Sequence, residues 1–177
     1  MTKRITISTL DAMKASGDKF VMITAYDATF ARLASEAGAE TILVGDSLGM
    51  VLQGHETTIP VSLDAMAYHT ECVARARPHS LIVADLPFMS FSNAEDTLHA
   101  STRLMQAGAQ MVKLEGGTWL SDSIHRLVER GVPVCAHLGL TPQSVNVFGG
   151  YRVQGRTPKE AKSILADAVE IQDAGAS

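Results

Sequence analysis

The chain has 177 residues, of which 46% are hydrophobic and 19% are charged, a composition typical of a soluble globular domain with one sizeable core. The net charge of −4 comes without a lysine and arginine cluster, which excludes nucleic acid or an anionic membrane as the expected partner and favours a small molecule. Because no apolar run approaches the roughly 18 residues that span a bilayer, and the start of the chain has no signal-peptide core, we expect a cytoplasmic protein.

Short runs rich in β-branched residues alternate along the chain with amphipathic stretches. Continuous hydrophobic runs of this kind are typical of parallel strands that are buried on both faces. The sequence predicts five such strands, at 20–27, 41–47, 80–87, 111–117 and 133–140.

The stretches between these runs have helical spacing and recognisable ends. After the first strand, the residues Phe30, Leu33, Ala34 and Ala37 fall on one predicted helical face. Gly38 and Gly108 stand where a left-handed C-terminal cap is expected, and Asn93 and Ser121 are predicted N-caps. The last helix is predicted to begin with a capping box at 157–160.

A repeated strand and helix unit gives either a doubly wound open sheet or a (β/α)8 barrel. The barrel is favoured because polar residues gather at the C-terminal ends of successive strands and no glycine-rich dinucleotide fingerprint follows the first strand. We therefore expect an α/β protein with a single domain, 1–177, and no internal boundary. Since such barrels contain about 250 residues, the chain is expected to hold about the first five units of a TIM barrel.

Charged side chains occur where the predicted strands end. Asp46, Asp85 and Glu115 are at three successive strand ends, accompanied by Lys113 and His137. Three carboxylates at one mouth repel one another unless a cation or protons intervene. Magnesium prefers oxygen ligands, so the pattern predicts Mg²⁺ held by the three carboxylates, with Lys113 as a fixed positive charge beside it.

Each of these residues alone also fits a structural role. A single acidic residue at a strand end is often a solvated loop residue or the N-cap of the next helix. Cys135 fits a small apolar filler better than a nucleophile, because the sequence places no base for it, and it has no CxxC partner in Cys72.

Six motifs in order make the chain resemble ketopantoate hydroxymethyltransferase, from about residue 5 to its end. These motifs are TAYD, LVGDSLGMVLQGHETTIPV, AYHT, ADLPFMSF, MVKLEGG and HLGLTPQSVNVFGGYRVQGR. The resemblance implies a (β/α)8 barrel, a magnesium ion and a cytoplasmic homodecamer of two pentameric rings. It also implies transfer of a hydroxymethyl group from 5,10-methylenetetrahydrofolate to 3-methyl-2-oxobutanoate, which gives 2-dehydropantoate in pantothenate and coenzyme A biosynthesis.

The resemblance also implies roles for particular residues. The metal ligands of the family fall on Asp46, Asp85 and Glu115. The substrate contacts fall on Asp46, Ser47, Asp85, Lys113 and His137. The enolate formed when C3 of the 2-oxo acid loses a proton would be stabilised by Mg²⁺ acting as a Lewis acid.

No catalytic residue is predicted within the chain itself. The general base of the family is a glutamate on the sixth strand, which is expected beyond residue 177, so the 177-residue chain alone is expected to have at most trace transferase activity. Two alternatives stay open. One is a non-catalytic fragment that retains metal and 2-oxo acid binding; the other is a magnesium-dependent lyase or transferase of the isocitrate lyase-like group, although the cysteine-containing loop motif usual in that group is absent.

Overall fold

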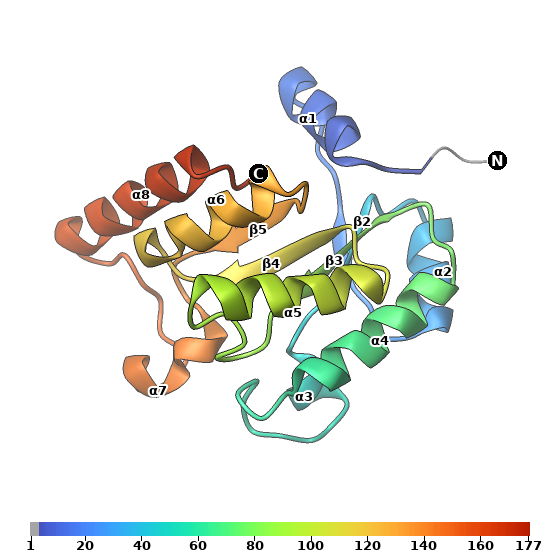
Figure 1. Ribbon diagram of the computed structural model, residues 1–177, viewed down its shortest axis with the longest axis horizontal. Helices are drawn as coiled ribbons and strands as arrows, with labels where there is room; N and C mark the ends of the chain where they lie inside the picture. The colour runs from blue at the N-terminus through green and yellow to red at the C-terminus, as the bar shows by residue number, and fades with distance from the viewer. Residues whose placement is uncertain (1–3) are drawn as a thin grey trace.

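The computed structural model describes residues 4–177, which form a five-stranded parallel sheet covered by helices (Figure 1). Each strand pairs with its neighbours in sequence, in the order β1-β2-β3-β4-β5. The strands are β1 (Met22–Thr24), β2 (Thr41–Val44), β3 (Leu81–Asp85), β4 (Met111–Glu115) and β5 (Val134–His137).

The strand order distinguishes between the two expected architectures. A doubly wound sheet has a point at which the strand order reverses, and the sheet formed by residues 4–177 has no such reversal. The five predicted parallel strands are therefore confirmed, and their order is that of consecutive βα units. A closed eight-stranded barrel stays a prediction.

The helices that follow the strands pack side by side, with α2 against α4, α4 against α5, α5 against α6 and α6 against α8. Figure 1 shows α5 lying in front of β3 and β4. No helix among the described residues is long and apolar enough to cross a membrane. The longer helices are α1 (Ile7–Ser16), α2 (Ala28–Glu36), α4 (Leu63–Arg75), α5 (Ala94–Gln106), α6 (Ser121–Glu129) and α8 (Pro158–Asp173). The short ones are α3 (Leu48–Val51), α7 (Val145–Phe148), η1 (Thr118–Leu120) and η2 (Pro142–Ser144).

Most predicted helix ends are confirmed. Asn93 caps α5 by accepting a hydrogen bond from the Asp96 N–H at 2.9 Å, and the capping box of α8 is formed between Thr157 and Glu160. Gly38 and Gly108 follow α2 and α5 with φ of 95° and 112°. The prediction for Ser121 is wrong: it is the first residue of α6, because the 3₁₀ turn η1 runs directly into that helix.

Two expectations about burial are also wrong. The first strand is exposed rather than buried on both faces, because β1 lies at one edge of the described sheet. On the predicted face of α2, Ala34 is buried as its helical position suggests, whereas Phe30 is 64% and Leu33 51% exposed. The residues that α2 buries are small, among them Ala31 and Ala34, and they let the helix lie close to its neighbours.

The alternation of side chains along the strands determines which face carries the functional residues. In β4, Val112 and Leu114 enter the main core beneath the helices, whereas Met111 belongs to a second cluster on the opposite face. Because side chains alternate, Lys113 and Glu115 share the face of Met111. The α1 residues Ile7 and Leu10 pack against this second cluster. The candidate site therefore lies on the sheet face turned away from the helix layer.

Candidate functional site

The C-terminal ends of β2, β3 and β4 bring three acidic side chains into one buried cluster. Asp46, Asp85 and Glu115 are only 3%, 4% and 6% exposed. The pairing of β3 with β4 places Asp85 beside Lys113, and the pairing of β4 with β5 places Glu115 beside His137. The sequence prediction that these residues gather at one mouth is thus confirmed in their positions.

Asp85 lies at the centre of this cluster. Its Oδ2 accepts a hydrogen bond from the Asp46 N–H at 3.1 Å, and its Oδ1 lies 2.7 Å from Lys113 Nζ. Within the described residues, Lys113 is the partner of this buried Oδ1, and no other group donates to it. The cluster therefore contains an acceptor oxygen with remaining capacity for a cation or a donor.

Burial and mutual repulsion shift the protonation of this cluster. Burial, followed by the neighbouring Asp85 carboxylate, raises the pKa of Asp46 to about 7. Burial also raises the pKa of Asp85, against the opposing effect of Lys113. Burial alone would lower the pKa of Lys113, but Asp85, Glu115 and Asp46 raise it above its usual value. The lysine is therefore a permanent cation, and the carboxylates still lack compensating positive charge.

Gln143, in η2 after β5, links the carboxylates and was not singled out from the sequence. Its Nε2 donates to Asp46 Oδ2 at 2.8 Å and to the Leu86 carbonyl at 2.9 Å, and its N–H donates to Glu115 Oε2 at 3.0 Å. The side chain is buried. In the sequence, Gln143 could be recognised only as a polar residue in the turn after a strand, within the motif HLGLTPQS. The sequence does not show that this turn folds back to the end of β2, where Asp46 lies.

His137 and Ser47 lie at the margins of the cluster. His137 Nδ1 lies 3.1 Å from Glu115 Oε1, and the ring is half-buried. Ser47 Oγ forms a 2.9 Å hydrogen bond with the Tyr26 hydroxyl, a partner that the sequence did not predict. Both predicted contact residues are thus near the acidic cluster, and each is held by a neighbour.

Gly45, the residue after β2, leaves room for the side chains of Ser47 and Asp85. A Cβ at this position would lie 2.9 Å from Ser47 Oγ and 3.4 Å from Asp85 Oδ2. Any side chain would therefore push apart the two residues that the site needs close together.

Two other polar groups have structural roles. Asp27 follows β1 but is an exposed N-cap of α2, where its Oδ1 accepts from the N–H groups of Thr29 and Phe30. Burial raises the pKa of the Cys135 thiol, which fits the expected apolar filler rather than a nucleophile.

The chemistry of the donor set fits a hard divalent cation. Asp46, Asp85 and Glu115 offer carboxylate oxygens, and Asp85 Oδ1 has Lys113 as its one partner among the described residues. Within residues 4–177, no group of three or more acidic, histidine or cysteine side chains has the spacing of a preformed metal site. Lys113 instead lies against Asp85 Oδ1, and the Gln143 amide donates to Asp46 Oδ2.

Comparison with known proteins gives a consistent match. Residues 4–177 match the family model described as ketopantoate hydroxymethyltransferase. The chain is 60% identical over 172 residues to 3-methyl-2-oxobutanoate hydroxymethyltransferase of Burkholderia vietnamiensis, covering 97% of this chain and 64% of the relative. It is 59% identical to 3-methyl-2-oxobutanoate hydroxymethyltransferase 2 of Pseudomonas aeruginosa, covering 98% of this chain and 65% of the relative. The chain thus spans slightly less than two thirds of the length of these relatives.

Solved structures with a similar fold are distant in sequence. A phosphonopyruvate hydrolase crystallised with oxalate and Mg²⁺ superposes with a TM-score of 0.71 at 17% identity, covering 94% of this chain and 59% of that one. A 2,3-dimethylmalate lyase, a member of the PEP mutase/isocitrate lyase superfamily, gives 0.68 at 16% identity, covering 96% and 60%. At such low identity these likenesses concern the fold alone.

Proposed function

The chain belongs to the ketopantoate hydroxymethyltransferase family, and we propose on this basis that it serves the transfer of a hydroxymethyl group from 5,10-methylenetetrahydrofolate to 3-methyl-2-oxobutanoate, giving 2-dehydropantoate. The observation that carries the proposal is the buried cluster of Asp46, Asp85 and Glu115 around Lys113. The cluster has the charge and the donor atoms that a 2-oxo acid and its counter-cation require.

Asp46, Asp85 and Glu115 would hold the magnesium ion. Two features support this: the three carboxylates are buried together, and two of them have raised pKa values that reflect repulsion and missing solvation. When bound, Mg²⁺ would supply Lewis-acid stabilisation of the negative charge that develops on the 2-oxo oxygen.

The side chains around the carboxylates would bind and orient the 2-oxo acid. The Lys113 ammonium would neutralise the substrate carboxylate, because it is the cation buried in the cluster and remains charged. Ser47, held by its hydrogen bond to Tyr26, would form a hydrogen bond to the substrate that fixes the substrate's orientation in the site. His137, hydrogen-bonded through Nδ1 to Glu115, would present its other ring nitrogen to the ligand.

The proton acceptor for C3 is not assigned within the described chain. Lys113 is a cation, and His137 is placed for binding through its contact with Glu115. The family resemblance supports the proposal that the general base is a glutamate outside the described residues.

The same family membership supports three further proposals. The sequential strand order supports a (β/α)8 barrel of which the described sheet is the first part. A cytoplasmic location and a homodecamer of two pentameric rings rest on the family resemblance. The fold likeness to the isocitrate lyase-like group does not favour that group's chemistry, since the high sequence identity is to the hydroxymethyltransferases.

Turnover tests where the general base lies and whether the acidic cluster is the site of the reaction. The protein is assayed with 3-methyl-2-oxobutanoate, 5,10-methylenetetrahydrofolate and Mg²⁺, with 2-dehydropantoate as the measured product. We expect that the 177-residue chain alone gives at most trace product, and that activity in any longer form is lost with Glu115→Gln. Near-normal turnover by the 177-residue chain would contradict the placement of the base, and unchanged turnover in Glu115→Gln would contradict the assigned site.

A further inference from the structure

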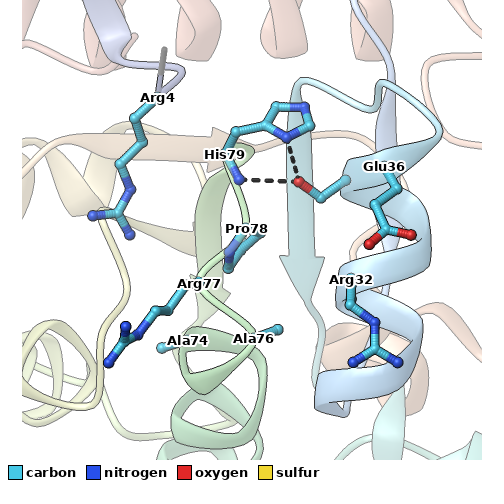
Figure 2. Close-up of a pocket in the computed structure, with 9 residues that line it drawn as sticks. Arg4, Arg32, Glu36, Ala74, Ala76, Arg77, Pro78 and His79 are labelled. Atoms are coloured by element: carbon cyan, nitrogen blue, oxygen red, sulfur yellow. Dashed lines mark hydrogen bonds between the residues drawn. The ribbon is translucent and has the colours of Figure 1, made fainter. Parts of the chain in front are cut away.

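A concave region lies at the N-terminal ends of the strands, at the opposite end from the acidic cluster. It is a cavity of about 760 Å³ between the C-terminal ends of α2 and α4, and we call it the arginine pocket (Figure 2). Its charged lining residues are Arg4, Arg32, Glu36, Arg77 and His79. Figure 2 shows Arg4 and Arg77 on one side and Arg32 and Glu36 on the other, with Pro78 between them.

The arginines of this pocket differ from most other arginines of the chain in having no partner. Among the described residues, none of the side chains of Arg4, Arg32 and Arg77 forms an ion pair or a hydrogen bond, and all three are exposed and accessible to a ligand. By contrast, Arg126 pairs with Asp122 at 3.0 Å. Three guanidinium groups and the single carboxylate of Glu36 leave a net charge of +2 on the lining side chains, before any charge on His79.

The backbone of Arg77 gives a second, independent indication. The described helices of nine or more residues each end within two residues of a residue with left-handed φ, and at α4 this residue is Arg77, with φ of 50°. In the others it is a glycine: Gly17, Gly38, Gly108, Gly131 and Gly175. An arginine is disfavoured in this conformation, and strained residues of this kind concentrate at functional sites.

The walls of the pocket are joined by hydrogen bonds that fix its shape. The Ile5 N–H donates to the His79 carbonyl at 2.7 Å, which holds the segment of Arg4 beside the turn that carries Arg77. Ser35 on α2 bonds to His79 twice, accepting from its N–H at 3.0 Å and lying 2.7 Å from its Nδ1. Three segments that are distant in sequence are therefore held around one cavity before any ligand arrives.

From these observations we propose that the arginine pocket binds the phosphate or diphosphate group of a small molecule. Guanidinium groups bind phosphate oxygens in pairs of parallel hydrogen bonds, and unpaired arginines do so without first breaking an ion pair. The cavity admits a group larger than a single phosphate. The site is separate from the acidic cluster, so its ligand would act alongside the 2-oxo acid rather than compete with it.

Calorimetric titration with inorganic pyrophosphate tests this proposal, in EDTA so that no metal is bound at the acidic cluster. The expected result is saturable binding at one site per chain, weakened tenfold or more by Arg77→Gly and by Arg32→Gln, because each removes a charge-assisted contact. Arg126→Ala is the matched control: it makes the same change in net charge on α6, outside the pocket, and should leave binding unchanged. Titration with inorganic phosphate distinguishes the two ligand groups, a preference for pyrophosphate indicating a diphosphate.

Arg77→Gly is informative because it replaces the strained residue with the one that the other helices use at the same place. We expect its melting temperature to equal or exceed that of the original chain. A lower melting temperature would show that Arg77 supports the fold and would overturn the proposal. So would the absence of saturable binding, an equal loss in Arg126→Ala, or a loss in only one of Arg77→Gly and Arg32→Gln.

Discussion

Replacing Asp46 by asparagine should stabilise the metal-free chain at alkaline pH. Burial and the Asp85 carboxylate raise the pKa of Asp46 from 3.8 to about 7 in the folded state. Between about pH 4 and pH 7 the folded chain thus holds a proton that the unfolded chain has lost, so the free energy of unfolding falls as pH rises through this window. At pH 8 the full difference corresponds to about 4 kcal/mol as an upper limit, since one pKa unit is about 1.4 kcal/mol.

The Asp46→Asn variant avoids this cost because its amide does not ionise, and it can still accept the hydrogen bond from Gln143. Urea denaturation in EDTA at pH 5 and pH 8 measures the effect. We expect Asp46→Asn to be more stable than the original chain at pH 8, by about 1 kcal/mol or more, with a smaller difference at pH 5.

Asp27→Asn is the control for this comparison, because the same chemical change falls on an exposed N-cap that asparagine serves equally well. Its stability should stay within roughly 0.5 kcal/mol of the original at both pH values. A variant Asp46→Asn that is no more stable than the original chain at pH 8 would refute the reasoning, since Asp46 would then be ionised without penalty.

Three further substitutions test the packing around the site and the best-defined helix start. Gln143→Leu removes the amide that donates to Asp46 and should lower the free energy of unfolding by about 1–3 kcal/mol in a denaturant titration; unchanged stability would contradict its linking role. Gly45→Ala places a Cβ 2.9 Å from Ser47 Oγ and should displace this side chain, so calorimetry should show at least about tenfold weaker binding of 3-methyl-2-oxobutanoate. Unchanged affinity would contradict the role of Gly45 in the site. Thr157→Ala removes the capping box of α8 and should cost about 1 kcal/mol in thermal unfolding, whereas Thr157→Ser should cost little; equal losses would argue against capping.

The positions of the acidic residues were predictable because parallel strands bring their C-terminal ends to one edge. Hydrophobic runs located β2 to β5, and the polar residue after each run identified Asp46, Asp85 and Glu115. The pattern of alternating side chains further placed Lys113 and Glu115 on one face.

Other features depend on tertiary contacts that sequence periodicity does not encode. Gln143 reaches Asp46 across 97 residues, and the fold of the loop after β5 decides this contact. The exposure of Phe30 was missed because an apolar residue at helical spacing fits either side of a helix until its neighbours are known. The arginine pocket could not be predicted from the sequence, because its three arginines are far apart along the chain and form no basic cluster there.

The central claim is that the cluster of Asp46, Asp85 and Glu115 binds a 2-oxo acid together with magnesium. The most direct measurement is calorimetric titration of 3-methyl-2-oxobutanoate with and without Mg²⁺, in the original chain, Glu115→Gln and the Asp27→Asn control. We expect Mg²⁺ to strengthen ketoacid binding in the original chain and in Asp27→Asn, and we expect Glu115→Gln to lose this enhancement. Binding that is the same with and without Mg²⁺, or an enhancement that survives in Glu115→Gln, would contradict the central claim.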